Sequence, residues 1–197
     1  MAGIVKGGGV SIASHNAGTD VVTLDNVTLG SSTVFPAGHV KQVLQATKTE
    51  KESVAGHATK DTYVAIAADG GSGNWEQTIT TTNSNKVLVS VHLSLGSTST
   101  YTIWWRMQRG STDFAYGTEP LSGQSSATAR VRITHNNANE VSSMTWLDSP
   151  STGTHTYRVV WQGESGVSAL LNRTSSNADA ASHGSLVSTI TLMEVTV

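Results

Sequence analysis

The chain has 197 residues, a formal net charge of −2 and no cysteine. The absence of cysteine excludes disulfides, thiolate metal sites and cysteine nucleophiles. Charged residues make up only 13 % and hydrophobic residues 37 %, both below the values of an average globular domain. Five tryptophans and a small net charge argue against disorder, which is associated with few aromatic residues and a high net charge. The composition therefore predicts a folded β protein rich in serine, threonine and glycine.

Membrane insertion is not expected for this sequence. No apolar run approaches the roughly 18 residues that a membrane helix needs. The start of the chain, residues 1–9, also lacks the apolar core of a signal peptide. We therefore expect synthesis in the cytoplasm, with lysis as a route of release if the protein acts outside the cell.

Residues 1–38 are predicted to form an extended N-terminal arm. They combine glycine clusters with short β-like pieces at 21–24 and 27–29. A segment of this length cannot bury a core of its own, so its order would have to come from a neighbour. The apolar residues that would anchor the arm are Ile4, Val5, Val21, Val22, Leu24 and Phe35.

Residues 39–197 are predicted to form the head domain. Residues 43–53 fit a helix as well as a strand, and the later segments favour strands because they are rich in β-branched and aromatic residues. Short strands separated by Gly-, Asn- and Pro-containing turns predict a jelly-roll-like antiparallel β-sandwich. The predicted strands are 86–95, 101–109, 126–134, 141–147, 154–162, 166–172 and 185–197.

The aromatic residues supply the candidate surface site. Trp104 and Trp105 are adjacent in a predicted strand, so their side chains point to opposite faces. If one fills the core, the other lies outside it, at a subunit interface or a ligand platform, unless a loop of the same chain shields it. Tyr157 and Trp161 in a second predicted strand complete this candidate site.

No catalytic, cofactor or metal site is predicted. None of the seven histidines has a metal-ligand spacing, no Gly-x-Ser-x-Gly nucleophile motif occurs, and the glycine runs lack the sequence of a phosphate loop. Two possibilities stay open: one histidine per subunit around a threefold axis, binding a metal or an anion, and two carboxylates that meet in space to cleave a glycan. The pairs Arg106/Arg109 and Arg130/Arg132 favour salt bridges or sheet packing over nucleic-acid binding, since the chain is slightly acidic.

Several short motifs occur in a fixed order between residues 36 and 197. They are PAGHV at 36–40, QVLQATKT at 42–49, NKVLVSV at 85–91, LDSP at 147–150, LNR at 171–173 and STITLMEV at 188–195. This succession resembles that of small β-rich fibre and structural virion proteins of marine and cyanobacterial tailed phages. The resemblance implies a trimeric jelly-roll head, similar in architecture to the heads of C1q and tumour necrosis factor, with no catalytic residues to carry over.

The sequence therefore predicts a non-enzymatic structural protein of a tailed-phage virion. We expect a homotrimeric surface fibre or decoration subunit whose arm binds other virion proteins of the capsid or tail, without nucleic acid or a cofactor. One alternative is a receptor- or carbohydrate-binding tip of a tail fibre that contacts a glycan of the host surface. A glycan-cleaving enzyme is a second alternative, and it would require two carboxylates with different pKa values facing each other.

Overall fold

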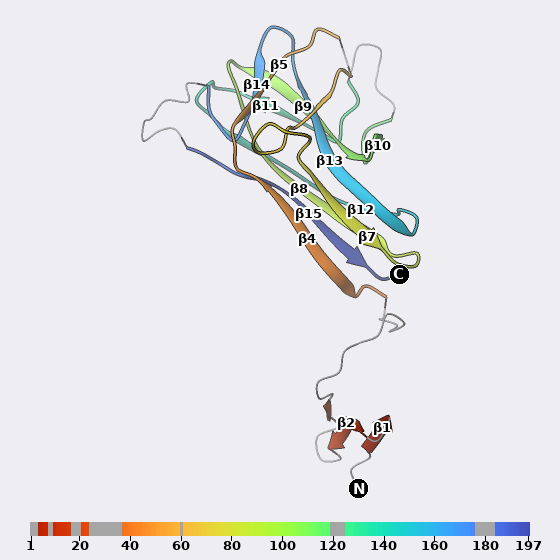
Figure 1. Ribbon diagram of the computed structural model, residues 1–197. Coiled ribbons are helices and arrows are strands. Elements are labelled where there is room, and N and C mark those ends of the chain that lie inside the picture. Colours follow the sequence, from red (N-terminus) through yellow and green to blue (C-terminus); the bar gives the residue numbers. More distant parts are fainter. Residues whose placement is uncertain are drawn as a thin grey trace. The chain divides into compact units, whose positions relative to one another are not determined.

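The chain forms two compact units made of β-strands. The computed structural model describes residues 4–7, 10–16, 21–23, 37–59, 61–118, 125–175 and 184–197. Within these residues no helix forms, and every pair of strands is antiparallel. The units are Met1–Phe35 and Pro36–Val197 (Figure 1), so the division falls just before the boundary predicted after residue 38. The all-β prediction is confirmed.

The N-terminal unit contains one small sheet. Its strands are β1 (Ile4–Gly7), β2 (Val10–Asn16) and β3 (Val21–Thr23), which pair in the order β1-β2-β3. The sequence predicted a β-like piece where β3 lies, whereas β1 and β2 were not predicted as strands. The other predicted piece, 27–29, lies outside the described residues.

Four of the six candidate anchor residues of the arm belong to strands of this sheet. Ile4 and Val5 belong to β1, and Val21 and Val22 belong to β3. Leu24 and Phe35 lie outside the described residues. The unit comprises only Met1–Phe35, and a unit of this size is marginally stable by itself.

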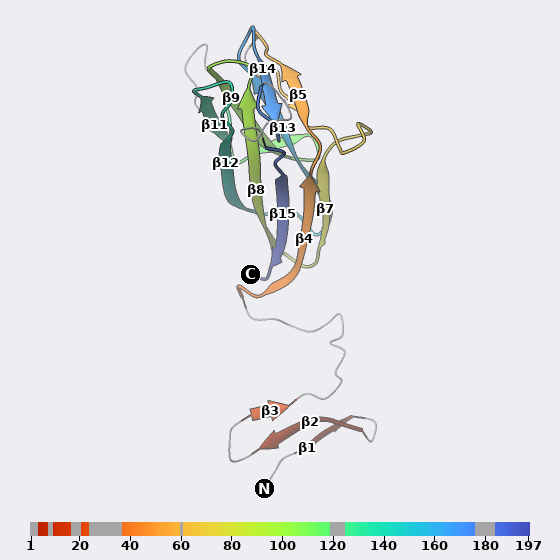
Figure 2. The same ribbon diagram turned by 90° about the vertical axis from the view of Figure 1, so that its left-hand side faces the viewer.

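The head consists of two antiparallel sheets packed face to face (Figures 1 and 2). In the first, here called the β8 sheet, β8 pairs with β12 on one side and with β15 and then β14 on the other. In the second, the β9 sheet, β9 and β13 pair at the centre. The β8 sheet contains β4 (Val40–Lys48), β5 (Glu52–Ala55), β8 (Lys86–Ser97), β12 (Glu140–Asp148), β14 (Ser168–Leu171) and β15 (Ser188–Val195). The β9 sheet contains β6 (Val64–Ala65), β7 (Glu76–Thr81), β9 (Tyr101–Arg109), β10 (Thr112–Phe114), β11 (Ala129–Ile133) and β13 (Gly153–Gly163).

The order of the strands is that of a jelly roll. In four places, two strands that follow each other along the chain occupy one position in a sheet. Three of these pairs share a neighbouring strand: β6 and β7 both pair with β13, β10 and β11 with β9, and β14 and β15 with β8. In the fourth, β4 pairs with β15 and β5 pairs with β14. Counting each pair as one position gives eight positions in the described head, in the order 1-8-3-6 in the β8 sheet and 2-7-4-5 in the β9 sheet. Successive positions therefore alternate between the two sheets except at 4–5, as in a double Greek key. The jelly-roll-like fold that the sequence predicted is present.

The core lies between the two sheets and is apolar, with a few polar links. Alternate residues of β8, Val87 to Leu95, are buried and face the aromatic residues of the β9 sheet. The indole Nε1 of Trp105 donates to Ser142 Oγ at 2.8 Å, which joins β9 to β12 across the core. Each large apolar side chain buried in this way stabilises the fold by roughly 1.5–3 kcal/mol.

Two segments differ from the sequence-based expectation for local reasons. Residues 43–53, which fitted a helix or a strand, form most of β4, a bend and the first half of β5, because Asp69 accepts hydrogen bonds from Thr49 N and Glu50 N and fixes the bend. Strand β7 was not predicted, because its sequence EQTITT offers only one large apolar side chain, Ile79, to the core.

A buried carboxylate closes one edge of the sandwich. Glu194 of β15 is 2 % exposed and accepts hydrogen bonds from Gln42 Nε2 at 2.7 Å, Thr82 N at 2.9 Å and Asn85 Nδ2 at 2.7 Å. Burial by itself would raise the pKa of Glu194, but these hydrogen bonds outweigh it and leave the pKa below the usual value of 4.5. The ionised carboxylate therefore holds β4 and the β7–β8 turn against β15.

We predict that Glu194→Gln destabilises the head at neutral pH but much less in acid. Because the pKa of Glu194 is lowered in the folded state, its contribution is complete above the unfolded pKa and is lost as the pH falls through the folded value. We expect the free energy of unfolding to fall by about 2 kcal/mol at pH 7 and by clearly less at pH 3, measured by urea denaturation. Glu76→Gln, which changes an exposed carboxylate on β7, is the control, and an equal loss at both pH values for Glu194→Gln would contradict this role.

Candidate functional site

The structure separates the four aromatic residues that the sequence proposed as a surface site. Trp105 and Trp161 are 0 % exposed and Tyr157 is 1 % exposed, so all three belong to the core. Their positions on β9 and β13 face the β8 sheet, so these three residues are corrected to core positions and cannot line a surface platform. Trp104 lies on the opposite face of β9 and is partly exposed. The expectation that the adjacent tryptophans occupy opposite faces therefore matches the structure.

The outer face of the β8 sheet carries an apolar row that sequence reasoning did not find. Val43, Met193, Leu88 and Leu147 are direct cross-strand neighbours on β4, β15, β8 and β12. Val43 is 55 % exposed and Leu147 46 % exposed, and the other two are half-buried. The row therefore crosses these four strands on the side away from the core.

The two rows that follow this apolar row consist of polar side chains and contain no Asp, Glu, Lys or Arg. Gln45 Nε2 donates to Thr191 Oγ1 at 2.9 Å, and the hydroxyls of Ser90 and Thr145 lie 3.1 Å apart. We call the three rows together the uncharged face, which belongs to strands that lie side by side in Figure 2. Its polar members are Gln45, Thr191, Ser90 and Thr145 in one row and Thr47, Thr189, His92 and Ser143 in the next. Depletion of charge together with exposed apolar side chains is typical of the centre of a protein–protein interface.

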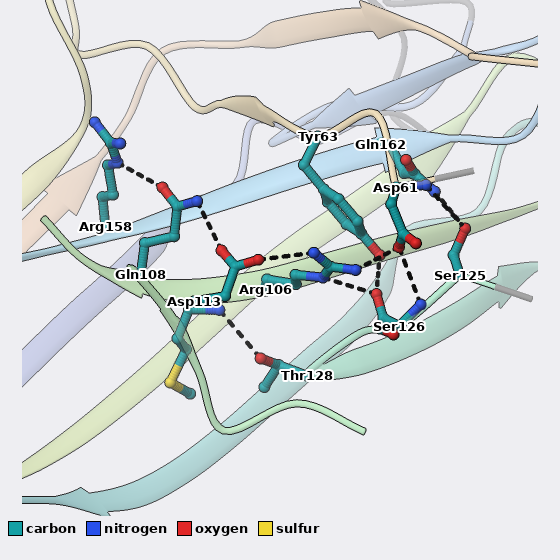
Figure 3. Close-up of polar contacts among 11 residues, drawn as sticks. Asp61, Tyr63, Arg106, Gln108, Asp113, Ser125, Ser126, Thr128, Arg158 and Gln162 are labelled. Carbon is teal, nitrogen blue, oxygen red and sulfur yellow. Dashed lines mark hydrogen bonds and ion pairs between the residues drawn. The ribbon is translucent and has the colours of Figure 1, made fainter. Parts of the chain in front are cut away.

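The outer face of the β9 sheet is organised differently, around Arg106 (Figure 3). The Arg106 side chain is 11 % exposed and forms ion pairs with Asp61 and with Asp113, the latter at 2.7 Å from Nη1. Its Nε donates to the carbonyl of Ser126 at 2.8 Å. These partners come from three separate segments outside β9, so one guanidinium holds all three segments against β9.

Aromatic rings complete the surroundings of Arg106. Its guanidinium lies 4.2 Å from the ring centroid of Tyr63 and 5.2 Å from that of Tyr116, distances that favour cation–π attraction. Burial raises the pKa of Tyr63 to about 12, although the charge of Arg106 acts in the opposite direction. The Tyr63 hydroxyl therefore stays protonated and donates to the carbonyl of Ser126. The charges and donors of this cluster are used within the fold, and we assign it a structural role.

A second ionic cluster brings two carboxylates to one lysine. Lys48 is 2 % exposed, and its Nζ lies 3.0 Å from Asp69 and 3.8 Å from Glu52. Burial raises the pKa of Glu52, whereas at Asp69 desolvation is outweighed by hydrogen bonds from Thr49 and Lys48, which lower the pKa. Opposite shifts also occur in acid–base pairs of enzymes, but here Glu52 accepts from Ala67 N and Asp69 from two further backbone amides. The geometry therefore indicates that this ionic cluster stabilises the bend between β4 and β5.

The remaining chemistry of the head is sparse. Among the residues that the structure describes, no group of three His, Asp or Glu side chains is placed to hold a metal ion. No helix in these described segments is long and apolar enough to cross a membrane. His92 is exposed on the uncharged face, and His155 Nε2 lies 2.7 Å from the carbonyl of Ser151.

We predict that Arg106→Gln lowers the free energy of unfolding by about 2–3 kcal/mol, because it leaves Asp61 and Asp113 partly buried beside no cation. Urea denaturation measures the change. Arg130→Gln removes an exposed guanidinium from the neighbouring strand and should change the stability by no more than about 0.5 kcal/mol. Similar losses in the two variants would show that Arg106 does not act through its ion pairs.

Comparison with known proteins adds no family assignment. No protein-family model matches the chain, and no curated protein matches it. Function is therefore inferred from the two outer faces of the head and from the division of the chain into two units.

Proposed function

We propose that this protein is a non-enzymatic, self-assembling surface subunit of a tailed-phage virion. In this proposal the head is a homotrimer that faces the medium, and the N-terminal unit attaches it to a capsid or tail protein. The uncharged face is the observation that carries the proposal. The succession of short motifs between residues 36 and 197, which resembles small virion proteins, supports the phage context.

The energetics of the uncharged face favour contact with other copies of the chain. Burial of Val43, Leu88, Leu147 and Met193 would remove apolar surface from water, at about 25 cal/mol for each square ångström. The adjacent threonine and serine rows bring no Asp, Glu, Lys or Arg, so association would not require the desolvation of a charge. A closed cyclic arrangement would also stop further growth. A trimer through this face is the assembly that we propose.

The N-terminal unit fits an attachment role because of its size. It comprises Met1–Phe35, contains no cysteine and is a compact unit separate from the head. Units of fewer than about 40 residues usually need a disulfide, a metal or association with another chain for stability. We therefore propose that this unit is stabilised where it binds the particle.

We predict a mass close to three times 20.6 kDa for the purified protein, measured by light scattering after size exclusion. Leu88→Glu together with Met193→Glu should yield a folded monomer, because two carboxylates would have to be desolvated at the centre of the interface. Thr78→Glu places one carboxylate on an exposed position of the β9 sheet and should leave the mass unchanged. A monomeric parent protein, or an intact trimer in the double variant, would refute assembly through the uncharged face.

A second prediction concerns the N-terminal unit. Deletion of residues 1–35 should leave a soluble head, since the contacts that begin the head, such as Gly38 N to the carbonyl of Thr196 at 2.8 Å, are retained. The truncated protein should no longer be incorporated when particles assemble in its presence, which immunoblotting of purified virions measures. The full chain with the same tag is the control, and incorporation of both proteins at equal levels would contradict the attachment role.

A further inference from the structure

In the described part of the head, two arginine side chains lack polar partners. The guanidinium groups of Arg130 and Arg132 on β11 form no hydrogen bond or ion pair there, and both residues are exposed. The other four arginines all have partners in the fold: Arg106, Arg109, Arg158 and Arg173. In the described part of the chain, the unpartnered guanidinium groups are thus restricted to one short strand.

Both guanidinium groups belong to the same face of the β9 sheet as Trp104. Residues two apart in a strand share a face, and the intervening Val131 packs against the core, so Arg130 and Arg132 point outward. Arg130 lies directly opposite Trp104 in the antiparallel ladder, and Arg132 lies opposite Thr102. Directly opposite residues have Cβ atoms about 5 Å apart. A partly exposed indole therefore adjoins two unpaired cations.

We propose that Trp104, Arg130 and Arg132 form a binding site for an acidic saccharide. A sugar ring has an apolar face of C–H groups that can pack on the indole of Trp104, and its carboxylate can accept paired hydrogen bonds from a guanidinium. The spacing of the two arginines along β11, roughly 7 Å, suits carboxylates on neighbouring parts of one saccharide chain.

The charge of the molecule favours a saccharide over a nucleic acid. A protein that tracks a phosphate backbone has a basic surface and a high isoelectric point, whereas this chain has a net charge of −2 and an isoelectric point near 6.4. The cations at this site are limited to one strand and are accompanied by a single indole. These features fit recognition of one or two acidic sugar units.

This site is independent of the proposed assembly. It lies on the outer face of the β9 sheet, and the uncharged face belongs to the β8 sheet. A trimer formed through the uncharged face would leave Trp104, Arg130 and Arg132 in contact with solvent. Binding at the site can therefore be measured whether or not the protein is trimeric.

The test compares polygalacturonate, which is acidic, with dextran, which is neutral, by biolayer interferometry on the full chain. We expect the protein to prefer polygalacturonate by about tenfold, since charge-assisted hydrogen bonds are roughly twice as strong as neutral ones. The double variant Arg130→Gln with Arg132→Gln should lose this preference. Trp104→Ala should weaken polygalacturonate binding by about tenfold as well, because the packing surface for the sugar ring is lost.

A distant variant and a competing polyanion test whether binding depends on these three residues. Lys51→Gln removes one exposed cation at a position before β5 and should leave the affinity for polygalacturonate unchanged. Light scattering and urea denaturation of each variant establish that assembly and folding are intact. The proposal is overturned if the parent protein does not bind polygalacturonate, if the double arginine variant binds as well as the parent, or if oligothymidylate displaces polygalacturonate at an equal concentration of charge.

Discussion

The alternation of side chains along β8 and β15 is the constraint on which both the core and the candidate interface depend. Val87 and Val89 point into the sandwich, so Leu88 between them must point outward. Leu192 is buried in the same way, and Met193 therefore faces out beside Leu88. A slip of one residue in this pairing would exchange the core set with the surface set. The same register that fills the core thus fixes an apolar row on the outside.

The two outer faces of the sandwich differ in how far other segments cover them. On the β9 sheet, Arg106 holds three segments through Asp61, Asp113 and Ser126, and two tyrosine rings lie beside the same guanidinium. On the β8 sheet, the uncharged face consists only of strand residues. None of its residues is Asp, Glu, Lys or Arg. The charged side chains are therefore distributed unequally between the two outer faces of the sandwich.

The sequence alone predicted the strands whose own residue types favour β structure. The aromatic and β-branched residues of β9 and β13 identified both strands, and the adjacent Trp104 and Trp105 were expected on opposite faces, where they lie. The apolar row could not be predicted, because Val43 and Met193 become neighbours only through the pairing of β4 with β15. Strand β7 was missed since half of its side chains are threonines, which pair with β13 across the sheet, as Thr78 does with Thr156. Both features depend on pairing between strands that are far apart in the sequence, which the residue types of one segment do not reveal.

The two outer faces differ in charge, so subunit assembly and ligand binding are expected to depend differently on ionic strength. Contacts on the uncharged face involve no Asp, Glu, Lys or Arg, so their strength depends mainly on apolar burial and little on ionic strength. Binding of an acidic ligand at Arg130 and Arg132 depends on exposed charges, which salt screens over about 8–10 Å. In the proposed arrangement, a higher salt concentration would therefore weaken ligand binding while the association of subunits would be retained. A surface subunit of the kind proposed would stay assembled in a saline medium, while its attachment to an acidic glycan would be reversible.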